Sequence, residues 1–236
     1  MSRDFDGSTQ YLNNANAIIT GYPFTLVAWF YSDSLTATQW ILGVSDSGSA
    51  AEEFGLYAGG SFAGDPVSLI SRTGSVNRIA STTAAYATGT WTHAAGRGIS
   101  ATERYAYIDG GSEGANTVDS TPLSLDRTRI GVKAGSTAAN YFDGKIADAA
   151  AWDIDIGVNA ILALADGVSP LKISPANLVF YCPIFGVQDP ERDYSANAYN
   201  MDLVNAPPAS SHFLDSVRPV RKHPHNVVIP SHPTHD

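Results

Sequence analysis

Carboxylates are the side chains of this sequence that could catalyse hydrolysis, and they are sparsely placed. Hydrolysis of a glycosidic bond with retention needs two carboxyl groups about 5 Å apart, one acting as nucleophile and the other as acid. Asp143 and Asp148 share one predicted strand, but their five-residue offset places them on opposite faces. We therefore expect no catalytic residue and no enzymatic activity. The only glutamates are Glu52, Glu53, Glu103, Glu113 and Glu191.

The second group with possible chemistry lies at the C-terminus. Residues 207–236 hold six of the 13 prolines and five of the six histidines. Histidines in a flexible segment without a nearby cysteine or carboxylate favour incidental metal affinity over a built site, so we expect no metal and no cofactor. The histidines concerned are His223, His225, His232 and His235.

The same segment also differs in charge from the rest of the chain. It is weakly basic, whereas the whole chain has a net charge of −9. A polar, proline-rich stretch cannot bury enough surface to fold alone. We therefore expect a domain at 1–206 followed by an extended arm at 207–236, with a disordered tail as the alternative. Arg218, Arg221, Lys222 and His223 are the expected contacts of the arm with an acidic partner.

Composition narrows the remaining classes of partner and location. An acidic chain is a poor match for nucleic acid or for an anionic membrane, because both need a basic surface. The single cysteine, Cys182, lies in an apolar run and is predicted to be a buried thiol. The N-terminus has no basic-then-apolar signal segment, so we expect synthesis in a cytoplasm without general export.

Strand signals recur every 10–15 residues and predict the elements that position these groups. Residues 24–31 are apolar on both faces and predict a strand buried on both sides. Residues 142–152 predict a long central strand, with Phe142, Ile146, Asp148 and Trp152 on one face. One helix is expected at 157–166, ended by Gly167. The pattern indicates an all-β sandwich with one short helix.

Six stretches in order resemble the laminin-G and pentraxin-like branch of the concanavalin A-like lectin and glucanase superfamily. The resemblance covers about residues 4–206 and implies a jelly roll of two antiparallel sheets packed face to face. It implies no single activity. The stretches are Phe5-Asp6-Gly7-Ser8, Phe24 to Phe30, Trp91-Thr92-His93 with Tyr105 to Gly110, Arg129-Ile130-Gly131, Phe142 to Asp148 with Trp152, and Leu178 to Ile184 with Asp193 to Ala198.

The resemblance also carries expectations about sites. Glucanase members of the fold place their acids in a Glu-X-Asp-X-X-Glu pattern, which this sequence lacks. Pentraxin-like members bind calcium through a loop corresponding to residues 51–53 and an acidic segment after the strand at 127–132. Here the second segment contains Lys133 where acids are needed. We therefore expect no calcium site, and expect Glu52 and Glu53 to be solvated loop charges.

Four aromatic residues near predicted loops could stack on sugar rings, although aromatics in a sandwich are more often core residues. Trp40 and Tyr57 are the two to which we assign possible glycan stacking, and Phe62 and Tyr86 are the others.

Three functions remain, of which a hydrolase is disfavoured by the missing acids and the other two are non-enzymatic. The first is a virion structural protein of a tailed bacteriophage, such as a capsid decoration or head or tail surface protein, anchored partly by the arm. Its partners would be other virion proteins and further copies of the chain. The alternative is a carbohydrate-binding, lectin-like adhesion module that recognises surface glycans.

Overall fold

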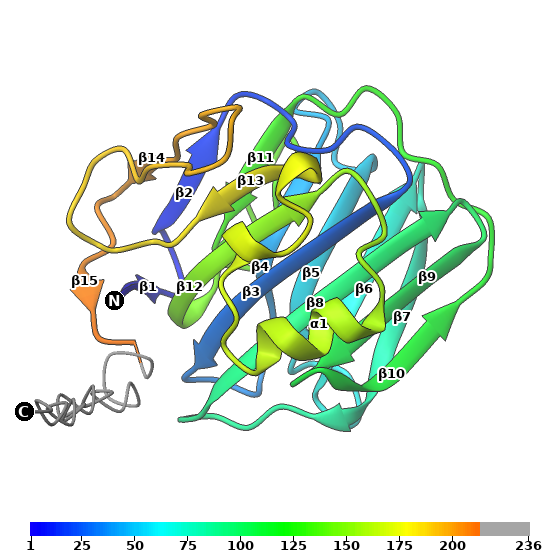
Figure 1. Cartoon of the computed structure of the whole chain (residues 1–236), viewed down its shortest axis with the longest axis horizontal. Helices are drawn as coiled ribbons and strands as arrows, with labels where there is room; N and C mark the ends of the chain where they lie inside the picture. Colours follow the sequence, from blue (N-terminus) through cyan, green and yellow to red (C-terminus); the bar gives the residue numbers. More distant parts are fainter. Residues whose placement is uncertain (213–236) are drawn as a thin grey trace, which may run out of the picture.

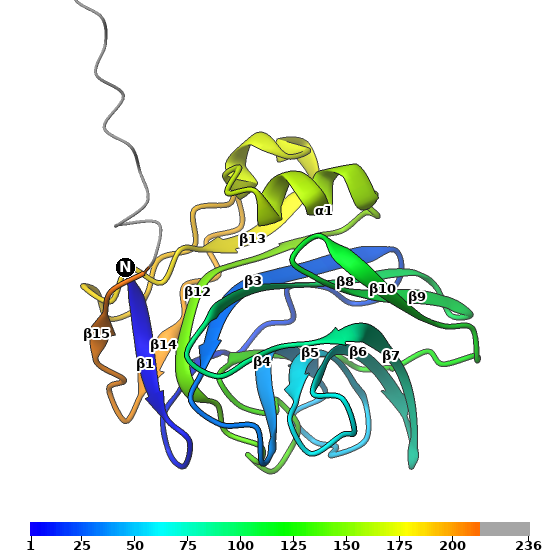
Figure 2. The same ribbon diagram turned by 90° about the horizontal axis from the view of Figure 1, so that it is seen from below.

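The protein is a two-layer sandwich of antiparallel sheets with one helix on its outside, as shown by a computed structural model that describes residues 1–212 (Figures 1 and 2). We call the eight-stranded layer sheet A. Its strands, in spatial order, are β10 (Gly111–Asn116), β9 (Glu103–Ile108), β8 (Trp91–Ser100), β3 (Phe24–Ser32), β12 (Asp143–Trp152), β1 (Ser2–Asp6) and β15 (Ala209–Ser210), with β13 (Leu178–Cys182) also paired to β12.

The seven-stranded layer, sheet B, faces it. Its strands, in spatial order, are β14 (Asp202–Val204), β2 (Tyr11–Asn14), β11 (Arg127–Ile130), β4 (Thr38–Ser45), β5 (Glu53–Gly59), β6 (Pro66–Thr73) and β7 (Val76–Ala85). Two sheets that pack in this way confirm the predicted jelly-roll sandwich. None of the described helices is long and apolar enough to cross a membrane.

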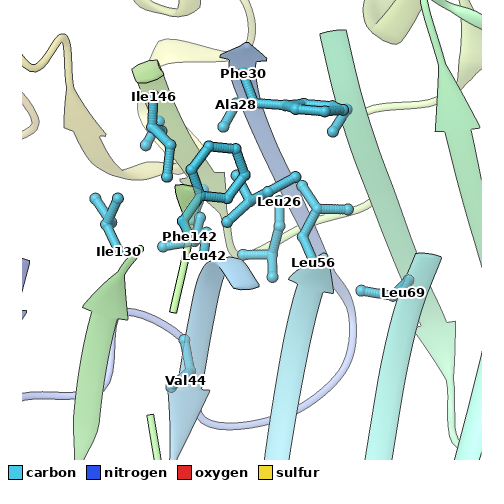
Figure 3. Close-up of a cluster of buried hydrophobic side chains, with 14 of the residues drawn as sticks. Leu26, Ala28, Phe30, Leu42, Val44, Leu56, Leu69, Ile130, Phe142 and Ile146 are labelled. Atoms are coloured by element: carbon cyan, nitrogen blue, oxygen red, sulfur yellow. The ribbon is translucent and has the colours of Figure 1, made fainter. Parts of the chain in front are cut away.

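The core lies between the two sheets and follows the alternation of the strands (Figure 3). Leu26, Ala28 and Phe30 of β3 face Leu42 and Leu56 of sheet B, and all five are fully buried. Cys182 is a free thiol in the same core, as predicted, and its burial raises the pKa of the thiol well above its usual range. Its packing is that of a small apolar residue.

The opposite face of sheet A is covered by the helix α1 (Val158–Ala165) and by the short 3₁₀ helices Pro170–Lys172 and Pro175–Asn177 (Figure 2). Ile161 and Leu164 of α1 pack against Trp152 and Tyr107, which explains why the strands of sheet A are apolar on both faces. Gly167, with φ of 85°, follows the helix as predicted. On the same helix, the apolar side chains of Val158 and Leu162 are exposed.

A β-bulge in the central strand changes the predicted assignment of its faces. The pairing of β12 with β3 shifts between Ala147 and Ala150, and Asp148 lies in the left-handed region with φ of 49°. Ile146 therefore points into the core, whereas Trp152 points outward under α1. The prediction that these two side chains share a face was wrong, because the bulge inserts a residue that simple alternation does not count.

The first residues of the predicted arm pack on the domain. The Pro207 and Pro208 carbonyls accept hydrogen bonds from Arg3 and from the backbone N–H of Asp4. Strand β15 then pairs with β1, and the His212 ring lies 4.4 Å from the Trp91 ring. Residues 207–212 therefore pack on the domain, and Ala209 and Ser210 extend sheet A. Arg218, Arg221, Lys222 and His223 lie outside the described residues.

The buried ion pair that ties β1 to residues 186–191 should be far more important to stability than a surface pair on the same strand. Arg3 Nε lies 2.7 Å from Glu191 Oε1, and both side chains are buried. Arg3→Met leaves the carboxylate unpaired and should lower the free energy of unfolding by about 3–5 kcal/mol in urea titrations. Lys145→Met, at a 3.6 Å pair with the more exposed Asp4, is the control and should change it by at most about 1 kcal/mol. Equal losses would contradict this assignment.

Candidate functional site

A small aromatic cluster lies on the outer face of sheet B, separate from the core. Trp40 and Tyr57, on the paired strands β4 and β5, have ring centroids 5.9 Å apart and planes inclined by 26°. They pack with Ile70 and Ile79 of the next two strands. A shift in the β4–β5 pairing between Trp40 and Leu42 accompanies the outward position of the Trp40 ring.

The Trp40 ring lies flat on two glycines. A Cβ atom added to Gly55 would come within 1.9 Å of the ring, and one added to Gly43 within 2.8 Å. Gly43 and Gly55 face each other across β4 and β5. Their missing side chains create the shallow space that the indole fills.

The two residues predicted to stack on glycans are brought together here, but their rings are covered. Trp40 is 3% exposed and Tyr57 is 2% exposed, and burial raises the pKa of Tyr57. The prediction that both offer open faces was therefore wrong, because neighbouring side chains and the loop before β12 enclose them. Tyr86 belongs to the main core. Phe62 is 41% exposed, with its ring 6.0 Å from that of Tyr57, and so provides the open aromatic surface.

A buried ionic group adjoins the aromatic cluster. Glu53, the first residue of β5, is only 1% exposed. Its Oε1 atom lies 3.1 Å from Lys133 Nζ and 3.5 Å from Arg72 Nη1. The prediction that Glu53 is a solvated loop charge was wrong. Glu53 is the first residue of β5, and its buried side chain lines a pocket.

The other carboxylate oxygen of this group has no hydrogen-bond donor. Oε2 of Glu53 is buried and makes no hydrogen bond to any residue of the described part of the chain. Burial raises the pKa of Glu53, while Lys133 and Arg72 act in the opposite direction. An acceptor with unused capacity in a pocket is a natural binding point for a ligand donor.

These groups line one cavity, which we call the sheet B pocket. Its volume is about 150 Å³. It combines the apolar surfaces of the aromatic cluster with the charged group and with amide and hydroxyl side chains, a combination that suits a ligand with both apolar and hydrogen-bonding faces. The residues that line it are Thr38, Trp40, Glu53, Tyr57, Phe62, Ile70, Arg72, Asn77, Ile79, Lys133 and Asn140.

The two segments considered for calcium do meet in space, but a lysine joins them. Lys133 Nζ donates to the Ala50 carbonyl at 3.2 Å and lies within 3.1 Å of Glu53. Its ammonium supplies positive charge to the groups that a cation would have to bind. Glu52 instead accepts hydrogen bonds from Thr73, Gly74 and Leu123 and so fastens neighbouring loops. Over residues 1–212, no cluster of three or more His, Cys, Asp or Glu is arranged to hold a metal ion.

A larger cavity of about 490 Å³ lies on the outer face of sheet A. The residues that line it include Trp29, His93, Leu164 and Tyr181. Burial lowers the pKa of His93 to about 3, so this imidazole is neutral at physiological pH. Met1 and His212 also line the cavity, which places both ends of the described chain beside it.

Neither cavity has the carboxylate pair that retaining glycoside hydrolysis needs. Among the described residues that line them, Glu53 is the only carboxylate of the sheet B pocket and Asp148 the only one of the larger cavity. Asp148 accepts a hydrogen bond from the Tyr181 hydroxyl at 2.8 Å. Asp143, five residues earlier on β12, is instead influenced by the negative charges of Asp33 and Asp4.

Glycine at position 55 should be required for the shape of the sheet B pocket. Gly55→Ala drives a methyl group into the Trp40 ring, which should lower the free energy of unfolding by about 1–3 kcal/mol and shift the tryptophan fluorescence. Gly21→Ala is the matched control, because nothing lies within 4 Å of its added Cβ, and it should stay within about 0.5 kcal/mol of the wild type. Equal stability of the two variants would show that the indole does not rest on Gly55.

Comparisons with known proteins agree with this architecture. None of the curated protein sequences matches this chain. A heptameric SAP-like pentraxin from Limulus polyphemus matches with a TM-score of 0.57 and 15% identity, over 72% of this chain and 83% of the pentraxin. The CBM40 of a Ruminococcus gnavus IT-sialidase, bound to α2,3-sialyllactose, matches with a TM-score of 0.56 and 13% identity, over 70% and 98% of the two chains.

Domain 4 of an extracellular arabinanase from Geobacillus stearothermophilus, in complex with arabinotriose, matches with a TM-score of 0.57 and 16% identity, over 70% of this chain and 76% of that domain. At such identities these structures show a shared fold. A laminin G-type family model, described as the concanavalin A-like lectin/glucanases superfamily, matches residues 6–161. That match spans more than half of the sequence, and the chain therefore belongs to the concanavalin A-like lectin/glucanases superfamily.

Proposed function

We propose that this protein is a non-catalytic, glycan-binding module and that its ligand binds in the sheet B pocket. The observation that carries the proposal is the exposed Phe62 ring beside a buried carboxylate with an unused oxygen. A sugar ring has an apolar face that stacks on an aromatic ring and an edge of hydroxyl groups that needs donors and acceptors. The pocket supplies both.

The family and the solved structures support this choice. Two of the similar structures contain a bound oligosaccharide, sialyllactose in the CBM40 and arabinotriose in the arabinanase domain. The fold alone assigns no ligand. The residues that line the pocket support glycan binding by this chain. Asn77, Asn140 and Arg72 add hydrogen-bond donors to the pocket that Phe62 also lines.

A glycan array followed by titration calorimetry tests the proposal. We expect the full chain to bind at least one oligosaccharide, and Phe62→Ala to weaken that binding by up to about tenfold, because an aromatic stacking contact contributes about 0.5–1.5 kcal/mol. Leu123→Ala is the control, since Leu123 is 65% exposed and does not line the pocket. Binding to no glycan, or equal affinity of the wild type and Phe62→Ala, would refute the proposal.

For the location of this module we propose the surface of a tailed bacteriophage particle, where the chain would be made in the host cytoplasm and assembled with other virion proteins. One geometric observation favours an anchored module. Residues 209–212 lie at β1 and at the outer face of sheet A, so the described chain ends on the side away from the sheet B pocket (Figure 2). Anchoring through later residues would leave the pocket open, and repeated copies would add avidity.

Truncation tests the anchoring proposal. Because residues 207–212 pack on the domain and include β15 of sheet A, the informative deletion removes 213–236. We expect the truncated chain to keep the melting temperature of the full chain and its glycan binding, and to lose co-purification with the native assembly. Full occupancy of the assembly by the truncated chain would contradict anchoring through Arg218, Arg221 and Lys222.

A further inference from the structure

We infer that Glu53, together with Lys133 and Arg72, makes the sheet B pocket selective for neutral sugars that present two adjacent hydroxyl groups. This inference rests on the proposed glycan-binding function and adds the chemical class of the ligand. It assigns Glu53 as a specificity-determining residue.

Glu53 offers a ligand one acceptor atom that the described chain leaves unused, Oε2. Both cationic contacts of Glu53 go to Oε1, whereas the buried Oε2 has no donor within residues 1–212. A buried polar atom without a partner is less stable than a hydrogen-bonded one, because it has lost its water without gaining a donor. A ligand O–H that donates to Oε2 removes that cost, and an O–H group is the donor that sugars carry.

Lys133 and Arg72, which both contact Glu53, also have N–H groups that are free to donate to a ligand. Lys133 has three N–H groups, and its ammonium has two partners, Glu53 and the Ala50 carbonyl. Arg72 uses Nε for Gly74 and Nη1 for Ala50, and its Nη2 makes no hydrogen bond to a described residue. Donors and an acceptor thus lie next to each other. Two adjacent hydroxyls match them, because one hydroxyl donates to Glu53 while the other accepts from a cation.

This arrangement of donors and acceptor disfavours sugars that carry a carboxylate. An ionised carboxylate accepts hydrogen bonds but has no O–H group with which to donate one, so it cannot be the donor that Oε2 of Glu53 lacks. It would also place a second negative charge beside a carboxylate that is already buried. Lys133 and Arg72 are each committed in part to Glu53. A neutral sugar leaves this ionic group intact, while the apolar face of the sugar stacks on Phe62.

The experiment compares matched sugars on the full chain. The probes are oligogalactose and oligoglucose, each paired with its counterpart in which the primary alcohols are oxidised to carboxylates. We expect at least one neutral oligosaccharide to bind, and its oxidised counterpart to bind at least about tenfold more weakly. Glu53→Gln, which keeps the size of the side chain but removes its charge, should weaken neutral binding by a similar factor. Glu52→Gln is the control, because Glu52 does not line the pocket, and it should bind like the wild type.

The outcomes separate this inference from the proposed function. If a sugar binds in a manner that depends on Phe62, but the oxidised sugar binds as tightly as the neutral one, the inference is overturned and the glycan-binding function stands. Unchanged affinity in a folded Glu53→Gln variant has the same meaning. If Glu53→Gln does not fold, the wild-type comparison of neutral and oxidised sugars decides alone. If the full chain binds no glycan on the array, both the proposed function and the inference fail.

Discussion

The need to neutralise one buried carboxylate organises the outer face of sheet B. Glu53 is enclosed at the start of β5, and a charge in that position is unfavourable unless cations and donors surround it. Lys133 comes from the loop before β12 and Arg72 from β6, so the requirement joins segments distant in sequence. Both cations also bond the Ala50 carbonyl, which draws in the loop before β5. The pocket is the space that these segments leave beside the aromatic cluster.

The two outer faces of the sandwich have different tasks. On sheet A, α1 covers large apolar side chains such as Trp152, and residues 209–212 extend the sheet and cross its outer face beside Trp91 (Figure 2). None of the helices described within residues 1–212 lies over sheet B. Its strands carry two small residues, Gly43 and Gly55, where the Trp40 ring lies flat. They also carry Glu53 at the start of β5 and Arg72 next to the end of β6. A module attached on the sheet A side would therefore leave the sheet B pocket accessible.

Much of the fold could be predicted from periodicity, and most of the site could not. The apolar alternation of residues 24–31 predicts β3, and Gly167 predicts the end of α1, because both signals are local. The bulge at Asp148 made the predicted faces of β12 wrong beyond that residue. Nothing in the alternation of apolar residues marks the inserted residue. The burial of Glu53 depends on Lys133, which lies 80 positions later in the sequence, and no local pattern links the two. Trp40 and Tyr57 were found as candidates from residue type, but their burial depends on tertiary packing.

The most direct test of the central claim is to locate the bound sugar on the protein. The chain has four tryptophans, and of these only Trp40 lies on sheet B, while Trp29, Trp91 and Trp152 lie on sheet A. Their indole N–H signals in an NMR titration with the neutral oligosaccharide selected on the array therefore report which face is occupied. We expect the Trp40 signal to shift in a saturable manner while the other three stay in place. Saturable shifts at Trp29 and Trp91 with an unmoved Trp40 signal would contradict it.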